Sequence, residues 1–125
     1  MVELKFKERG GLLPAIAQDF ATGEILMQAF INEEAWQETL KTGRAVYFSR
    51  SRSKLWRKGE ESGNVQLVKE ILVDCDFDSV IFKVEQIGGA ACHTGHRSCY
   101  FNRVEGDTLV ECSEQVFDPE KVYKK

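Results

Sequence analysis

One internal segment of this 125-residue chain has the pattern of an amphipathic helix, and short β-like runs surround it on both sides. Asn32 is a good helix cap, Ile31 and Trp36 occupy the positions of a hydrophobic staple, and Gly43 can end the helix. The sequence therefore predicts one main helix over Glu33–Thr42.

The runs around this helix are short and either apolar or alternating in polarity, as is typical of strands. They cover residues 2–6, 12–17, 24–30, 45–49, 65–74, 80–86, 98–104 and 108–111, and the last two form a hairpin around residues 105–107. Helices do not alternate with these strands as they do in βαβ units, so we expect a mostly β (α+β) fold, an antiparallel sheet or a small barrel. Asp118, Pro119 and Glu120 are expected to cap a short C-terminal helix.

The composition is that of a folded globular protein, with 42% apolar and 30% charged residues. No linker, repeat or charge run divides the chain, so we expect a single domain over residues 1–125. The formal charge of −3 argues against a nucleic-acid polymer as partner. The first eleven residues contain no long apolar stretch, so neither a signal peptide nor a membrane span is expected, and the cytoplasm is the default location. In that reducing compartment the four cysteines favour metal ligands, nucleophiles or buried thiols over disulfides.

Three carboxylates, Asp74, Asp76 and Asp78, occupy alternate positions, with Cys75 between the first two. In an extended chain this spacing puts the carboxylates on one side and the thiol on the other. Carboxylate oxygens suit Mg²⁺ or Ca²⁺, whereas a thiolate suits Zn²⁺, so the segment could serve two metals. The alternative is a solvated acidic turn between two strands. An EF-hand loop is disfavoured, because Ser79 stands where that loop needs glycine and the flanking runs are β-like.

The segment 91–99 holds both histidines of the chain, His93 and His96, and two of its four cysteines, Cys92 and Cys99. Thiolates with an imidazole nearby are typical zinc ligands, and three thiolates with one open position make a catalytic site. Cys75 could supply the third thiolate. A closed structural site with either histidine as the fourth ligand, or a pair of inert buried thiols, explains the same residues. The spacing of the two cysteines is not that of a standard zinc finger, and it leaves the structural and catalytic alternatives open.

The polar stretch from residue 49 to residue 64 carries five cations among hydroxyl groups and glycines. We expect a loop there that forms a local phosphate-binding surface, and Trp56 could stack on a base. An ordinary solvated basic loop is the alternative. The net negative charge of the chain favours a small phosphate ligand over a polymer.

Taken together, these segments resemble the phosphoribosyl-AMP cyclohydrolase family, enzymes of histidine biosynthesis that open the adenine ring of their substrate with water. The similarity covers nearly the whole chain, including residues 17–19 and 24–27 near its start. The residues that carry it are Tyr47-Phe48-Ser49-Arg50-Ser51-Arg52, Leu55-Trp56, Lys58-Gly59-Glu60, Ser62-Gly63, Asp74-Cys75-Asp76 with Asp78, and Cys92-His93-Thr94-Gly95 with Arg97-Ser98-Cys99.

This resemblance implies a homodimer of monofunctional, single-domain chains in which a mixed, largely antiparallel sheet forms a pseudobarrel. It implies a catalytic Zn²⁺ at the subunit interface, bound by Cys92 and Cys99 of one chain and Cys75 of the other. It also implies that the three aspartates of the acidic segment bind Mg²⁺.

The implied reaction is hydrolysis of the N1–C6 bond of 1-(5-phosphoribosyl)-AMP, which gives the formimino-aminoimidazole carboxamide ribonucleotide. His93, adjacent to an expected zinc ligand, is the expected general acid or base, and His96 is the second candidate. The expected substrate-binding residues are Arg50, Arg52, Lys54, Trp56, Lys58, Glu60, Ser62 and Arg97.

Two other functions use similar residues. The alternative to an enzyme is a zinc-stabilised binding module that recognises a nucleotide without turnover. Such a module would unfold when the metal is removed. A zinc nucleobase deaminase is disfavoured, because its H-x-E and P-C-x-x-C signature is absent.

Overall fold

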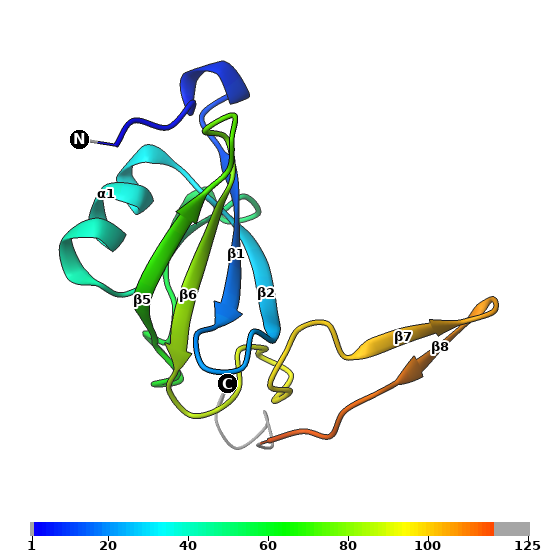
Figure 1. Ribbon diagram of the computed structural model, residues 1–125. Helices are drawn as coiled ribbons and strands as arrows, with labels where there is room; N and C mark the ends of the chain where they lie inside the picture. Colours follow the sequence, from blue (N-terminus) through cyan, green and yellow to red (C-terminus); the bar gives the residue numbers. More distant parts are fainter. Residues whose placement is uncertain (1, 117–125) are drawn as a thin grey trace.

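The computed structural model describes residues 2–116, and in that part of the chain a curved sheet is flanked by one α-helix and extended by a hairpin (Figure 1). The sheet has the strand order β4-β3-β2-β1-β6-β5 and curls into a half-barrel. Its strands are β1 (Leu13–Asp19), β2 (Ile25–Ile31), β3 (Val46–Ser49), β4 (Lys54–Arg57), β5 (Gln66–Val73) and β6 (Val80–Gln86).

The pairing of the strands confirms the mixed, largely antiparallel sheet. β1 runs antiparallel to β2 and parallel to β6, while β5 and β6 form an antiparallel pair. The parallel pair at the centre is possible because β2 and α1, among other elements, separate β1 from β6 in sequence, which gives the long crossover that parallel strands need. The fold is mostly β with one main helix, as the sequence predicts.

The helix α1 spans Glu33–Thr42, the range that the sequence predicts. The Asn32 side chain accepts a hydrogen bond of 2.8 Å from the backbone N–H of Ala35, which satisfies one of the free donors of the first turn. Gly43 ends the helix in the left-handed conformation, at φ 74°. Trp36 packs its ring parallel to that of Phe82, with 6.4 Å between the ring centroids, and so attaches the helix to the sheet.

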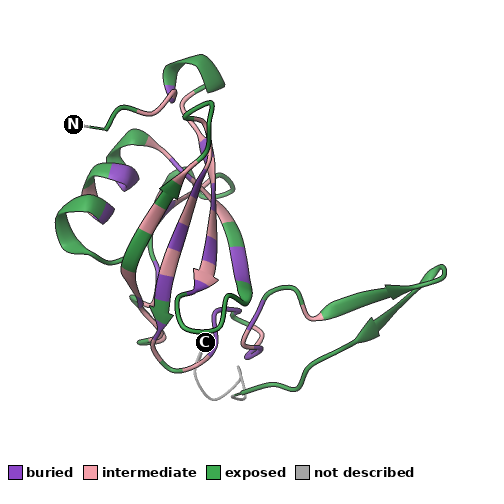
Figure 2. Cartoon of the chain, in the orientation of Figure 1, coloured by how far each residue is buried: buried purple, intermediate pink, exposed green. Residues whose placement is uncertain are grey.

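The core lies between the helix and the concave side of the half-barrel. Every second residue of β1 is buried, and β6 follows the same alternation over most of its length, as Figure 2 shows for the central strands. Burying each large apolar side chain of this set contributes about 1.5–3 kcal/mol to folding. The fully buried members on these two strands are Leu13, Ala15, Ala17, Val80, Phe82 and Val84.

Two sequence predictions are wrong in detail. Residues 2–6 form no strand: they lead into a short 3-10 helix, η1 (Lys7–Arg9), and Phe6 is the one buried side chain among residues 2–6. The stretch predicted to be a loop contains the strand β4, whose Trp56 pairs with Tyr47 of β3. A mostly exposed edge strand needs no apolar face, so polarity alone did not reveal it. The predicted helix at residues 118–120 lies outside the described residues.

A hairpin of β7 (Asn102–Glu105) and β8 (Thr108–Glu111) projects from the half-barrel as an arm. The predicted hairpin is confirmed, although its first strand begins four residues later than expected. Every residue of both strands is exposed, and Figure 2 shows the arm in a single colour. No helix in the described part of the chain is long and apolar enough to cross a membrane.

Candidate active site

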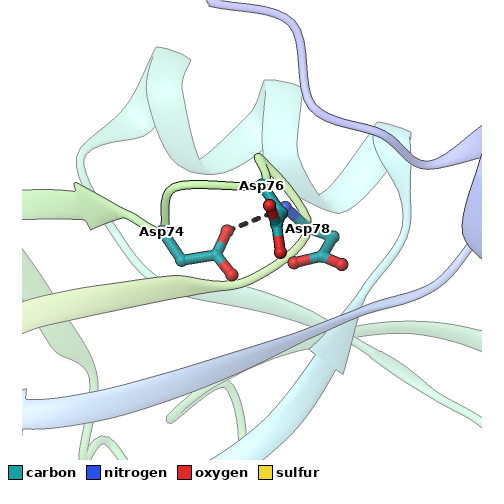
Figure 3. Close-up of side chains that lie close together, drawn as sticks. All are labelled: Asp74, Asp76 and Asp78. Atoms are coloured by element: carbon teal, nitrogen blue, oxygen red, sulfur yellow. Dashed lines mark hydrogen bonds between the residues drawn. The ribbon is translucent and has the colours of Figure 1, made fainter.

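The acidic segment forms a tight turn between β5 and β6. Ligand oxygens of Asp74, Asp76 and Asp78 all lie within 4.8 Å of one another. Figure 3 shows the three side chains gathered at the turn. The sequence argument placed these carboxylates on one side of an extended chain, but a turn brings them together instead. Phe77 adopts a left-handed backbone at φ 61°, which allows the chain to reverse within this short segment.

Local hydrogen bonds hold this turn. One carboxylate oxygen of Asp74 accepts from the backbone N–H of Asp78 at 2.9 Å and from that of Ser79 at 3.2 Å. The N–H of Asp78, followed by the other backbone donors, lowers the pKa of Asp74 below its ordinary value. Arg9 of η1 donates to Asp78 at 2.9 Å. Three clustered carboxylates fit a hard divalent cation such as Mg²⁺.

The cysteine-containing segment folds back on itself beside β2. The backbone N–H of Cys92 donates to the carbonyl of His96 at 3.1 Å, and that of Ala91 donates to the carbonyl of Arg97 at 2.9 Å. The backbone N–H of Cys99 donates to Leu26 of β2 at 2.7 Å. These bonds attach the segment that carries both cysteines to the edge of the β1–β2 hairpin.

The Cys92 thiol lies close enough to the Cys99 thiol to affect its pKa. Burial, together with the neighbouring Cys92 thiol, raises the pKa of Cys99 to about 12. Thr94 donates a hydrogen bond of 2.9 Å to the Cys92 sulfur. Cys99 is therefore a poor nucleophile at neutral pH, whereas a bound metal would displace its proton. Two adjacent thiols are donors of the kind that Zn²⁺ prefers.

Cys75 does not join this pair within one chain. Cys75 is exposed in the acidic turn, Cys99 is also exposed, and Cys92 is buried. Among residues 2–116, the three aspartates are the one group of three or more potential ligands close enough to share a metal ion. A third thiolate for Cys92 and Cys99 would have to come from another molecule.

The two histidines differ in their surroundings. His96 is buried, and its ring stacks on Phe101 with 3.7 Å between centroids. Its Nε2 lies 2.8 Å from a carboxylate oxygen of Glu111, and its Nδ1 lies 3.0 Å from the hydroxyl of Ser113. Both ring nitrogens of His96 are thus engaged by the segment that includes the end of the arm. His93, in contrast, is exposed next to Cys92.

The basic stretch contributes one buried cation and several exposed ones. Lys58 is 6% exposed, and its ammonium group lies 5.7 Å from the centre of the Trp56 ring. Burial lowers the pKa of Lys58, and the nearby thiols of Cys99 and Cys92 act in the opposite direction. Lys58 therefore belongs to the thiol site, and its positive charge would favour thiolate there.

The other residues expected to bind substrate lie nearer the surface. The Arg50 guanidinium stands 4.1 Å from the centre of the Phe30 ring, and the half-exposed Trp56 ring tilts against that of Tyr47. The Ser62 hydroxyl accepts from the backbone N–H of Asn64 at 3.1 Å. Exposed side chains on the same stretch belong to Arg52, Lys54 and Glu60.

Sequence reasoning missed a buried polar network beneath this site. The Tyr47 hydroxyl donates to the Gln66 side chain at 2.6 Å, and Gln66 donates to Gln86 at 2.9 Å. Burial, followed by the charge of the nearby Cys99, raises the pKa of Tyr47 well above its ordinary value. Both glutamines look like ordinary outward-facing strand residues in the sequence, so no local signal reveals them.

Sequence reasoning also missed the partners of Arg97, whose guanidinium pairs with Asp19 at 2.9 Å and with Glu24 at 2.6 Å. Both acids lie in the opening segments that carry part of the family resemblance. Their position near the start of the chain gave no sign that they meet a residue more than seventy positions away.

Comparison with known proteins shows the family of this chain. The family model for phosphoribosyl-AMP cyclohydrolase matches residues 27–101. Relatives named phosphoribosyl-AMP cyclohydrolase include one from Desulfatibacillum aliphaticivorans, 66% identical with full coverage of both chains, and one from Desulforapulum autotrophicum, 63% identical over 99% of this chain and 100% of its own. A third, from Geobacter metallireducens, is 55% identical with full coverage of both.

The chain is therefore a hydrolase, which confirms the enzyme class that the sequence predicts. More particularly, the chain belongs to the phosphoribosyl-AMP cyclohydrolase family, so the resemblance noted in the sequence is confirmed.

Proposed function

We propose that this protein hydrolyses the N1–C6 bond of the adenine ring in 1-(5-phosphoribosyl)-AMP and so opens that ring in histidine biosynthesis. The product is the formimino-aminoimidazole carboxamide ribonucleotide. The observation that carries the proposal is the thiol pair of Cys92 and Cys99 beside the buried cation of Lys58, in a chain of this family. Such a pair suits a metal that activates water for attack on a ring carbon.

Two metals complete this site. Cys92 and Cys99, with Cys75 from a second copy of the chain, would hold Zn²⁺, and the three aspartates would hold Mg²⁺. When bound, zinc supplies the Lewis acidity that makes water nucleophilic near neutral pH. The acidic turn offers three carboxylate ligands. Proteins commonly bind Mg²⁺ through one or two carboxylates together with water and substrate phosphate oxygens.

His93 moves the proton in this account. Its exposed ring is adjacent to Cys92, so it can take a proton from the attacking water or give one to N1 as the C6–N1 bond breaks. His96 is less suited to that task, because both of its ring nitrogens already bind Glu111 and Ser113.

The basic stretch binds the substrate. The exposed cations of Arg50, Arg52 and Lys54 can meet its phosphate groups, and the half-exposed Trp56 ring offers a face for the base. Glu60 and Ser62 follow on the same segment and can accept hydrogen bonds from the ribose hydroxyls.

An assay of purified protein tests this function. Loss of phosphoribosyl-AMP should require zinc, and a chelator should stop turnover while Mg²⁺ in excess fails to restore it. Tight nucleotide binding without any turnover in the zinc-loaded protein would instead support a zinc-stabilised binding module. Turnover that is unaffected by complete removal of zinc would contradict the role proposed for the thiols.

The arm supports the homodimer. An isolated two-stranded hairpin is at best marginally stable in water. The rest of the described chain covers neither face of this hairpin, because every residue of both strands is exposed. Val104 and Leu109 face each other across the hairpin and are 70% and 67% exposed. The arm also continues into the Glu111 and Ser113 contacts with His96, beside the thiols that lack a third partner. A second copy that brings Cys75 to those thiols would therefore lie alongside the arm.

Sedimentation of an arm variant tests the dimer. Replacing Val104 and Leu109 together by serine should weaken dimerisation at least tenfold, because the apolar pair would no longer be buried. The matched control replaces Arg103 and Glu105, which lie on the opposite face of the same hairpin, by serine. If both double variants weaken dimerisation equally, the arm contributes only as a folded hairpin and not through its apolar pair. A wild-type protein that sediments as a monomer would contradict the dimer.

A further inference from the structure

Arg97 lies within the loop that carries both thiols, two residues before Cys99, yet its side chain leaves that loop. Its Nη2 atom is 2.9 Å from a carboxylate oxygen of Asp19, and its Nε atom is 2.6 Å from one of Glu24. Asp19 ends β1 and Glu24 immediately precedes β2. One guanidinium therefore bridges both sides of the β1–β2 turn.

The receiving carboxylates are themselves fixed in place. The second oxygen of Asp19 accepts from the backbone N–H groups of Thr22 at 2.8 Å and Ala21 at 3.1 Å. Burial alone would raise the pKa of Asp19, but the hydrogen bonds from Thr22 and the charge of Arg97 hold it below its ordinary value. Asp19 is thus an ionised, hydrogen-bonded anchor rather than a mobile surface acid.

The backbone around Arg97 connects this anchor to both thiols. The Arg97 carbonyl accepts from Ala91, directly before Cys92, at 2.9 Å. On the other side, the Ser98 hydroxyl donates to Ile25 of β2 at 2.7 Å, and the next residue is Cys99. A shift of Arg97 would therefore move Cys92 and Cys99 relative to each other.

The charges at Arg97 argue against a direct role in binding phosphate. Two carboxylates on one guanidinium leave a local excess of negative charge, which repels an anionic ligand. The exposed cations of residues 50–54 carry no such carboxylate partners among the described residues.

We propose that Arg97, held by Asp19 and Glu24, is a positioning residue that sets the separation of the Cys92 and Cys99 thiols for metal binding. This inference rests on the proposed function, because it concerns the thiols assigned there to zinc. Partners that orient metal ligands in proteins typically contribute 10- to 100-fold in metal affinity or activity. We expect Arg97 to act in that range.

Zinc binding to the metal-free protein is the direct test. Arg97→Met should lower zinc affinity about 10- to 100-fold and kcat by a similar factor, while KM changes less than about threefold. Glu24→Gln and Asp19→Asn should each reproduce part of this loss. Arg97→Lys keeps the charge but not the fork of donors and should recover only part of the affinity. In the metal-free protein, hydrogen exchange at the Cys99 amide should be faster in Arg97→Met than in wild type.

Lys83→Met is the matched control, because Lys83 is a cation of similar exposure that pairs with Glu70 elsewhere on the sheet. It should leave zinc affinity unchanged. A substrate-binding Arg97 would give the opposite result: KM would rise tenfold or more in Arg97→Met, zinc affinity would stay the same, and Glu24→Gln would lower KM by freeing the guanidinium. That pattern would overturn the proposal. A wild-type protein that binds no zinc would instead refute the proposed function, and the amide-exchange result would still decide whether Arg97 fixes the loop.

Discussion

The acidic turn and the cysteine loop are both candidate metal sites, but they are built in opposite ways. The turn gathers its three carboxylates from five consecutive residues, and backbone donors of the same turn hold Asp74. The loop presents two thiols and depends on bonds to β2, to Asp19 and Glu24, and to the residues around the arm. The carboxylate cluster thus lies within one chain. The described chain brings no third thiol to Cys92 and Cys99, and in the proposed site that thiolate would come from a second copy.

The largest effects are expected in the cysteine loop. Cys92→Ala and Cys99→Ala should each reduce zinc content and activity to background, because two thiolates cannot hold the ion in a defined tetrahedral site. Metal analysis and the ring-opening assay measure both quantities. Cys112→Ala is the control: this exposed thiol donates to the carbonyl of Phe101 and forms no group of three ligands with Cys92 and Cys99 among the described residues, so its loss should leave both quantities nearly intact. Full activity in zinc-replete Cys92→Ala would contradict the assignment.

The two histidines of the same loop are expected to differ in role: His93 in proton transfer and His96 in the stability of the fold. His93→Ala should lower kcat by roughly 10²- to 10⁴-fold with zinc content unchanged, as expected for a lost general acid or base. His96→Ala should instead destabilise the fold, because it removes the stack on Phe101 and leaves Glu111 and Ser113 without their partner. Thermal unfolding and kcat separate the two effects. A larger loss of kcat in a folded, zinc-loaded His96→Ala protein would move the proton-transfer role to His96.

A smaller effect is expected at the acidic turn, where one carboxylate has a second task. Asp76→Asn should weaken Mg²⁺ binding by about tenfold and leave the unfolding temperature unchanged, because the Asp76 side chain has no hydrogen-bond or ion-pair partner among residues 2–116. Asp74→Asn should weaken Mg²⁺ binding and also lower the unfolding temperature, because the amide is a poorer acceptor for the N–H groups of Asp78 and Ser79. Calorimetry with Mg²⁺ and thermal unfolding provide the two readouts. Equal unfolding temperatures for the two variants would show that the turn does not need Asp74.

The smallest effect is the pH dependence of that turn. The pKa of Asp74 is lower in the folded state than its ordinary value of 3.8, so its contribution to stability is present above about pH 4 and is lost as the pH falls through the folded pKa. The difference in unfolding temperature between wild type and Asp74→Asn should therefore shrink between pH 5 and pH 2. A constant difference over that range would mean that ionised Asp74 does not hold the turn.

The same contrast explains how far the sequence could be interpreted. The bounds of α1 were predictable, because a cap and a staple are local signals. The sequence also singled out the acidic segment, but its carboxylates meet through a tight turn and not through their alternate spacing in an extended chain. The pairing of Arg97 with Asp19 and Glu24, and the burial of Lys58 beside the thiols, were not, because they depend on how distant strands pack. The edge strand β4 escaped prediction for a related reason: its polar residues carry no pattern of burial.

Complementation between two inactive variants tests most directly whether the thiol site is shared between subunits. Cys75→Ala and Cys92→Ala should each be inactive alone. In a mixed dimer, one of the two interfaces would pair an intact Cys75 with an intact Cys92 and Cys99, so activity should return towards half the wild-type value per heterodimer. No recovery, with subunit exchange demonstrated by tagged chains, would contradict the account and place each site within a single chain.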